Sequence, residues 1–283
     1  MLGATHDEQG NVIMNITEHA IHLLAEVERS VQDHYRDFDD LAHGFEHVLR
    51  VYHLALHLAE QEHADGFIVG MAALLHDLGR TTRGPTRSHA ERSVKLAKQL
   101  LAAYDLPSET LHAILHAIMA HGYRHGIEPA TLEARVLFDA DRLDSLGACG
   151  VMRWAMTMKR GRWPEMRTYH PDDPFALWRE PDGQLYLLDR FFTKLLKLQE
   201  AMTTTTGRAM AARRIAFLRL YLQELLRELA EGGSGYDLSE EVTYGLLWRK
   251  YRGEEQEKEQ SIEDLQRGRV VDMSRLSEEQ HLA

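Results

Sequence analysis

A chain of 283 residues is long enough to bury a sizeable core in one large domain or two modest ones. Its formal net charge of −11 argues against general nucleic-acid binding, because phosphate backbones select basic surfaces. The single cysteine, Cys149, excludes a disulfide framework and a cysteine-based zinc site, and we expect it to be a small buried packing residue.

Residues 1–16 are predicted to form an N-terminal extension, in which no signal peptide is recognisable. From residue 17 onward apolar residues recur at helical spacing and strand-like alternation is nearly absent, which predicts an all-α fold. Helices are expected at 17–34, 45–62, 66–78, 89–104, 109–121, 131–159, 187–202 and 207–231. The longest apolar run, 67–75, is about half of a membrane span, so we expect a cytoplasmic protein without membrane partners.

Histidines concentrate in the first half of the chain. Of 17 histidines, 11 fall between His43 and His125, and only two come later. Histidine is the commonest metal ligand and a frequent acid or base, so this half is where chemistry is expected.

The second predicted helix begins with the segment HGFEHVLRV, residues 43–51. Its apolar residues Val51 and Leu58 lie within about 40° of His47 on a helical wheel, so His47 is predicted to point inward. A lone inward histidine is more often a hydrogen-bonded core residue than a ligand. Arg50, one turn later, is expected either to bind a phosphate or to form a surface salt bridge.

The third predicted helix is apolar on nearly every side and ends in His76 and Asp77. Burying an imidazole and a carboxylate side by side is costly unless they pair with each other or bind an ion. Either a His–Asp hydrogen-bonded pair or a metal site would satisfy these two buried groups. Arg80 follows directly and has the same two alternatives as Arg50.

Two further histidines lie on the next two predicted helices. His89 follows Ser88, which with Glu91 predicts a capping box at the start of the fourth helix. His121 shares a helix face with the apolar residues of the fifth helix and is predicted to point inward.

The sixth predicted helix carries the segment DADRLDSLGA, which begins at Asp139. Three carboxylates so close together repel one another unless a cation neutralises them. On the wheel, Asp141 shares the inward stripe with Leu137, Ser145, Ala148 and Met152. We expect Asp139 or Asp144 to orient ligands or to pair with Arg142. Histidines combined with carboxylates suit a first-row divalent metal.

The remaining chain is predicted to be less regular. Four of the seven prolines lie between 164 and 181, so residues 160–186 are expected to form an irregular excursion, either a surface loop or a lid. The domain is expected to span 17–231. A glycine-rich break and a charged tail follow at 232–283.

The order His47, His76-Asp77 and Asp141 resembles the H…HD…D pattern of the HD-domain superfamily. The segments HGFEHVLRV, LLHDLGR and DADRLDSLGA are similar to small soluble bacterial HD hydrolases, and the resemblance covers about residues 18–231. It implies a helical bundle with the metal at its centre. It also implies hydrolysis of a phosphomonoester, a phosphodiester or a nucleotide pyrophosphate.

This resemblance gives each candidate residue a role. One divalent ion, Mg or a transition metal such as Mn, Fe, Co, Ni or Zn, is expected on His47, His76, Asp77 and Asp141. The expected catalytic residues are Asp77, His121 and His89, and the expected substrate-binding residues are Arg50, Arg80 and Arg142. The partner is a small phosphorylated substrate such as a nucleotide, and a homo-oligomer is compatible with the sequence. In binuclear members histidines placed like His89 and His121 bind a second metal, so the metal count stays open.

Two other functions remain open. Some relatives of this fold hold two irons and oxidise C–H or C–P bonds with O₂, which requires both His89 and His121 as ligands. A non-enzymatic nucleotide sensor is the third reading, although a sensor has no need to keep an intact ligand set.

Overall fold

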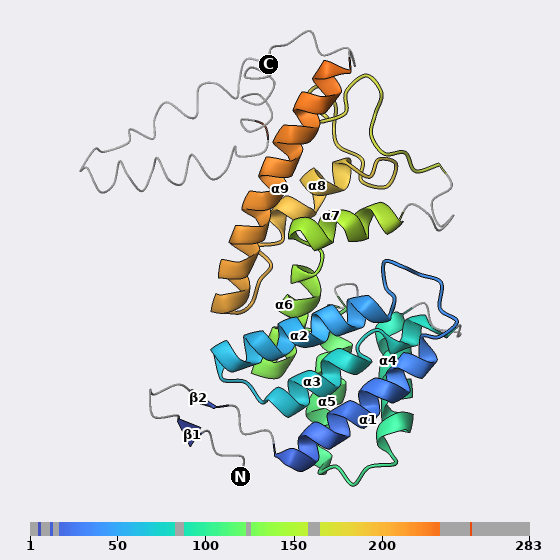
Figure 1. Cartoon of the computed structure of the whole chain (residues 1–283), viewed down its shortest axis with the longest axis vertical. Coiled ribbons are helices and arrows are strands. Elements are labelled where there is room, and N and C mark those ends of the chain that lie inside the picture. Colours follow the sequence, from blue (N-terminus) through green and yellow to red (C-terminus); the bar gives the residue numbers. More distant parts are fainter. Residues whose placement is uncertain are drawn as a thin grey trace, which may run out of the picture. The chain divides into compact units, whose positions relative to one another are not determined.

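Helices dominate the structure, a computed structural model that describes residues 17–82, 88–122, 126–157 and 165–232, Lys250, and the backbone of 5–6 and 12–13. The α-helices are α1 (Glu18–His34), α2 (Phe45–Glu62), α3 (Gly66–Leu75), α4 (His89–Leu101), α5 (Ser108–Ala120), α6 (Leu132–Leu143), α7 (Gly147–Met156), α8 (Asp189–Thr193) and α9 (Thr205–Glu231) (Figure 1). Two 3₁₀ turns, η1 (Leu78–Arg80) and η4 (Leu195–Lys197), and two antiparallel strands, β1 (Thr5–His6) and β2 (Val12–Ile13), complete the elements. The predicted all-α fold is confirmed.

The chain divides into two compact units. The first comprises residues 1–168 and 182–222, and the second comprises 169–181 and 223–283, so the division falls within α9. Every residue proposed above for the site belongs to the first unit. The domain boundaries expected from the sequence remain a prediction.

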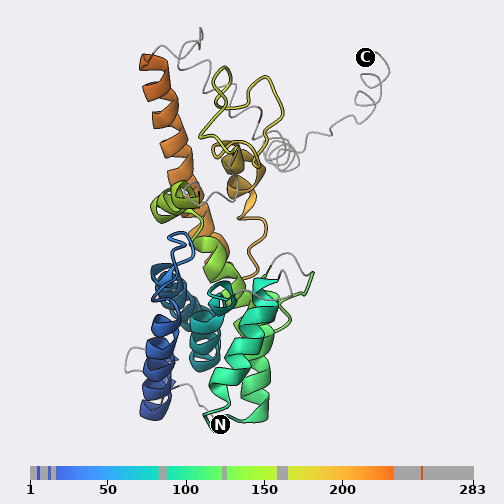
Figure 2. The same ribbon diagram turned by 90° about the vertical axis from the view of Figure 1, so that its right-hand side faces the viewer.

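Helix α3 forms the centre of the first unit. Every residue from Val69 to Leu75 is buried, and α3 packs against α1, α2, α5 and α6, with α1 and α5 on different sides of it (Figure 2). The Asp65 side chain caps its first turn by accepting hydrogen bonds from the backbone N–H groups of Phe67 and Ile68. Because α3 is buried along its length, whatever follows its last residue lies in the interior.

The helix predicted at 131–159 is in fact two helices. Helix α6 ends at Leu143, and α7 begins at Gly147, whose φ of 71° is a left-handed conformation that glycine adopts without strain. The helical wheel that placed Ala148 and Met152 on the same face as Asp141 assumed one continuous helix. It therefore does not hold after Leu143, where α6 ends. Both of those side chains are exposed, Met152 by 52%.

The prediction that Cys149 is a buried packing residue is also wrong. Cys149 is exposed. It lies in the first turn of α7, next to Ala148, which is exposed as well.

The helix predicted at 187–202 is also interrupted. Helix α8 ends at Thr193, and Lys194 leaves the helical conformation with φ −139° and ψ −58° before η4 begins. Phe191, Phe192 and Leu195 of this short segment are buried.

The second unit contains part of the excursion predicted at 160–186. Residues 160–164 lie outside the described residues, as does the predicted tail apart from Lys250 and the first position of the break, Gly232. Within the unit, Asp173 accepts hydrogen bonds from the backbone of Leu177 and Trp178, and Lys250 donates to the carbonyl of Ala176. Among the described residues no helix combines the length and apolarity that crossing a bilayer demands.

Candidate metal centre

Two histidines of the site stand at helix C-termini and bond to their own helices. His76 follows the last residue of α3, and its Nδ1 lies 2.7 Å from the carbonyl oxygen of Ala73. His121 follows α5 in the same way, with Nδ1 2.5 Å from the carbonyl oxygen of Ile118. A carbonyl only accepts, so each Nδ1 carries the proton and donates it. Nε2 is therefore the nitrogen of each ring that is left to face the site.

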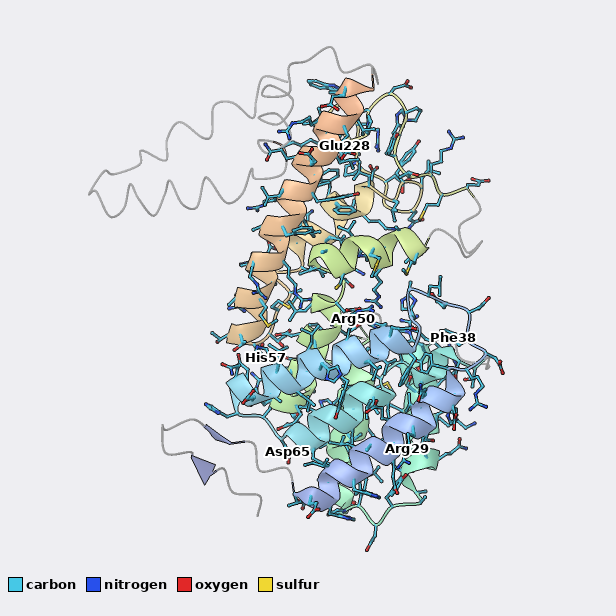
Figure 3. All side chains as sticks on the ribbon, in the orientation of Figure 1. Arg29, Phe38, Arg50, His57, Asp65 and Glu228 are labelled. Carbon is cyan, nitrogen blue, oxygen red and sulfur yellow. The ribbon has the colours of Figure 1, made fainter. Side chains whose placement is uncertain are left out.

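The third histidine, His47 on α2, is oriented by a carboxylate. Its Nδ1 lies 2.7 Å from Oδ2 of Asp144, the residue that ends α6. Arg50, which extends from α2 (Figure 3), donates from Nε and Nη2 to the two oxygens of the same carboxylate. The bond to Asp144 occupies Nδ1, so Nε2 is the nitrogen of His47 that faces His76.

Four imidazoles converge on the Asp77 carboxylate. Nε2 lies within 3.5 to 3.7 Å of an Asp77 oxygen in His47, His76, His89 and His121. The structure thus brings together the two histidines expected as metal ligands and the two expected as catalytic groups.

Hydrogen-bond acceptors outnumber the donor protons in this cluster. Oδ1 of Asp77 is buried and has no hydrogen-bond partner among the described residues. Nε2 of His47 and of His76 lie 3.4 Å apart, although the Nδ1 bond of His76 leaves its Nε2 as a lone pair. Converging lone pairs around a buried, unpaired carboxylate oxygen are unfavourable unless a cation lies among them. The residues present therefore fit a metal ion.

Two groups of ligand atoms have the spacing for a metal ion in the described part of the chain. The first is His47, His76 and Asp77, and the second is Asp77, His89 and His121, with the ligand atoms of each group within 4.8 Å of one another. Nε2 of His89 and His121 are 3.2 Å apart. The two groups share Asp77, one carboxylate with two oxygens.

Asp141 lies beside the first group. Its Oδ1 lies 3.5 Å from Nε2 of His47. Burial acts to raise the pKa of Asp141, but the nearby His47, His76 and Arg153 outweigh it and lower that pKa below its ordinary value. The carboxylate is ionised and ready to bind a cation.

Asp139 is directed elsewhere. It is fully buried and accepts hydrogen bonds from the backbone N–H and hydroxyl groups of Thr203 and Thr204, directly before α9. Of the two carboxylates expected to orient ligands or pair with Arg142, only Asp144 contacts a histidine of the site.

The pKa values of the central pair follow from burial and charge. Burial raises the pKa of Asp77, but Arg80, His76 and the other histidines reverse this and hold it well below its ordinary value. Burial lowers the pKa of His76 to about 4. At neutral pH the pair is therefore a carboxylate beside a neutral imidazole, which is the protonation state of metal ligands.

The arginines expected to bind substrate differ in position. Arg80 donates from Nε to Asp77 at 2.5 Å, and its Nη2 lies 3.3 Å from Nε2 of His89, so it belongs to the site. Arg50 forms a salt bridge with Asp144, a buried carboxylate and not a surface one. Arg142 is 7% exposed. Its guanidinium donates to the carbonyl oxygen of Phe138 and lies over the phenyl ring of the same residue.

Two residues of this region escaped the sequence analysis. Arg153 on α7 lies with Nη2 3.1 Å from Nε2 of His47, and no signal marked it because the helix break was not foreseen. Tyr35, the C-cap of α1, has a buried hydroxyl without a hydrogen-bond partner among the described residues. Burial raises its pKa well above the ordinary value, and the charge of Asp77 adds to this effect.

Comparison with known proteins agrees with this geometry. The family model of the HD domain matches residues 44–146, the stretch that begins just before α2 and ends after α6. The chain is 29% identical over 194 residues to the uncharacterized protein YpgQ of Bacillus subtilis, covering 66% of this chain and 84% of that one. It is 33% identical to ribonuclease Y of Thermoanaerobacter pseudethanolicus over 103 residues, only 18% of that enzyme.

Solved structures support the same relationship. The crystal structure of B. subtilis YpgQ in complex with ADP superposes with a TM-score of 0.58 at 29% identity, covering 74% of this chain and 96% of that one. An HD-superfamily hydrolase of Bacillus thuringiensis gives a TM-score of 0.58 at 27% identity, covering 75% and 98%.

Proposed function

We propose that this chain, in which residues 44–146 match the HD domain, is a metal-dependent phosphohydrolase acting on a small phosphate ester, a nucleotide or a related phosphomonoester, phosphodiester or pyrophosphate. The observation that carries this proposal is the buried, unpartnered Oδ1 of Asp77 among converging imidazole nitrogens. The crystallised complex of the relative YpgQ with ADP favours a nucleotide.

The ligands of the ion would be His47, His76, Asp77 and Asp141. The chemistry supplied by a divalent ion when bound there is Lewis-acid activation of water and of the phosphoryl group. Asp144 lies at hydrogen-bond distance from Nδ1 of His47, which would leave Nε2 available to the ion. This second layer of hydrogen bonds preorganises the ligand set.

The other residues would handle protons and charge. His121 and His89 each present Nε2 within 3.6 Å of Asp77, close enough to take or give a proton at a reacting oxygen. The guanidinium of Arg80 lies beside both His89 and Asp77 and would neutralise charge that develops on the phosphoryl oxygens.

One observation favours a second candidate. The Asp77, His89 and His121 group has the ligand types for a second ion, and two irons in these positions would suit oxidation with O₂. The sequence left the direction of His89 open, whereas the structure brings it to His121. The metal content therefore decides between the two functions.

The test begins with metal analysis of protein purified without added metal. A screen for phosphate release from nucleotides and simple esters under Mg²⁺, Mn²⁺, Co²⁺ and Zn²⁺ follows. We expect one tightly bound divalent ion and metal-dependent phosphate release. Two irons per chain without phosphate release would favour the oxygenase. Nucleotide binding without turnover under any metal would favour a sensor.

A further inference from the structure

Two cations near the metal centre share one aromatic ring. The guanidinium carbon of Arg190 and Nζ of Lys194 each lie 5.3 Å from the ring centre of Trp154. Arg190 belongs to α8, and Lys194 is the residue directly after that helix, with its backbone N–H donating to the carbonyl oxygen of Arg190. The positive charges of Arg190 and Lys194 repel each other at this spacing, but the fold holds both side chains over the same ring.

The positions of both cations are fixed from two directions. Phe191, Phe192 and Leu195 are buried, which prevents α8 from turning Arg190 and Lys194 away. The indole N–H of Trp154 donates to the carbonyl oxygen of Ser145 at 3.2 Å.

That hydrogen bond ties the ring to the end of the metal-ligand helix. Ser145 lies one residue after Asp144, the C-cap of α6, and four after Asp141. The ring under the two cations is therefore anchored beside the candidate metal centre.

Neither cation has a carboxylate partner among the described residues. Arg190 donates from Nε to the carbonyl oxygen of Gly183, which leaves its two terminal nitrogens available. Burial by the surrounding protein lowers the pKa of the Lys194 amine, and the charges of Arg142, Arg153 and Arg190 add to this effect, whereas the charge of Asp141 opposes it.

Metal binding would remove that remaining compensation. Asp141 is a proposed ligand, and its negative charge would then be shared with the ion. The cations around Lys194 would lack a counter-charge and would attract an anion with several charges. Arginine and lysine are the residues that proteins use to bind phosphate.

We propose that Arg190 and Lys194, supported by Trp154, form a second phosphate subsite that holds the phosphates not being cleaved. The subsite selects substrates with two or more linked phosphates, the class of nucleoside di- and triphosphates. This assignment rests on the proposed hydrolase function, because the first phosphate is the one at the metal centre.

The test measures binding separately from turnover. Isothermal titration calorimetry compares inorganic triphosphate with orthophosphate on the full-length protein in excess Mg²⁺. The variants are Lys194→Gln and Arg190→Gln, and the matched control is Lys197→Gln, a solvent-exposed lysine on η4. We expect each test variant to weaken triphosphate binding about tenfold or more, as loss of a charged hydrogen bond does, with orthophosphate binding nearly unchanged.

The possible outcomes distinguish failure of the proposed subsite from failure of the proposed hydrolase function. Unchanged triphosphate affinity in both variants would overturn the subsite, even if the wild-type protein hydrolyses phosphate esters. Equal weakening of triphosphate and orthophosphate would also overturn it, because the pair would then serve the reacting phosphate. Selective loss of triphosphate binding supports the subsite, even in a protein that releases no phosphate and so fails the proposed function.

Discussion

Nδ1 of His47 and Oδ2 of Asp144 lie 2.7 Å apart although 97 positions separate the two residues in the chain. This bond joins α2 to the end of α6 and decides which nitrogen of His47 faces the centre. The carboxylate also accepts from Arg50, so its charge is held in place and partly balanced.

Replacing this carboxylate should weaken metal binding without removing a ligand. We expect Asp144→Asn to lower the affinity for Mn²⁺ by roughly 10- to 100-fold, as loss of groups that orient ligands does. Titration calorimetry on metal-stripped protein measures this, with Asp105→Asn, at an exposed aspartate, as the control. An affinity equal to that of the wild type would show that Asp144 has only a structural role.

Removing a central ligand should be more severe. We expect His76→Ala or Asp77→Ala to abolish metal binding and hydrolysis while the helical circular dichroism spectrum stays largely intact. His57→Ala is the matched control, because His57 is an exposed histidine on α2 (Figure 3). Full activity in either ligand variant would contradict the proposed centre.

His121 separates one metal ion from two. We expect His121→Ala to cut turnover by about 10²-fold, as loss of an acid, a base or an orienting group does, with the metal content of the purified protein unchanged. Metal analysis by mass spectrometry and steady-state kinetics test the two parts separately. Loss of half the metal would instead show that the Asp77, His89 and His121 group holds an ion of its own.

The buried histidine also predicts a pH dependence of the metal-free protein. The pKa of His76 is about 4 in the folded chain because burial lowers it from 6.5. Between these values the unfolded chain binds a proton that the folded chain does not, so stability falls as the pH falls from 6.5 to 4. By pH 5 the loss from this group is about 2 kcal/mol.

Urea denaturation of metal-free protein at pH 7 and pH 5 measures this effect. The matched variant is His76→Gln, which has no titrating imidazole at this position. We expect the difference between the two pH values to shrink in the variant. A pH dependence identical to that of the wild type would assign the loss to other groups.

A glycine in the first turn of α9 gives a prediction about stability alone. A Cβ at Gly207 would lie 2.3 Å from Oδ2 of Asp139 and 2.7 Å from the hydroxyl of Thr204. We expect Gly207→Ala to lower the free energy of unfolding by about 1–3 kcal/mol through this overlap. Urea denaturation tests it, with Arg208→Ala as a neighbouring control. An unfolding midpoint at or above that of the wild type would contradict the tight packing.

The sequence predicted the helices that one continuous apolar stripe defines. Helices α1, α2 and α3 begin within a residue of their expected positions, and His47 is buried as its wheel position indicated. The spacing of apolar residues was sufficient to predict these helices, because burial of one apolar face determines where each of them lies.

The spacing of apolar residues was insufficient where the backbone conformation of one residue ends a helix. Nothing in the stripe near Asp141 signals that Gly147 adopts a positive φ, so the site contact of Arg153 could not be foreseen. The direction of His89 depends on the chain before it, at 83–87, which has no periodicity. Its contact with His121 is a tertiary contact that no local pattern encodes.

The histidines that end α3 and α5 have a consequence for local unfolding. Each closes its helix by bonding to a carbonyl three residues earlier, so the last turn and the ligand nitrogen are held by the same bond. Fraying at the end of α3 would therefore withdraw a proposed ligand, and fraying at the end of α5 would withdraw a proposed acid or base. A bound ion would oppose the first in proportion to its affinity, so slowed hydrogen exchange at the backbone amides of the last turn of α3 would accompany metal loading.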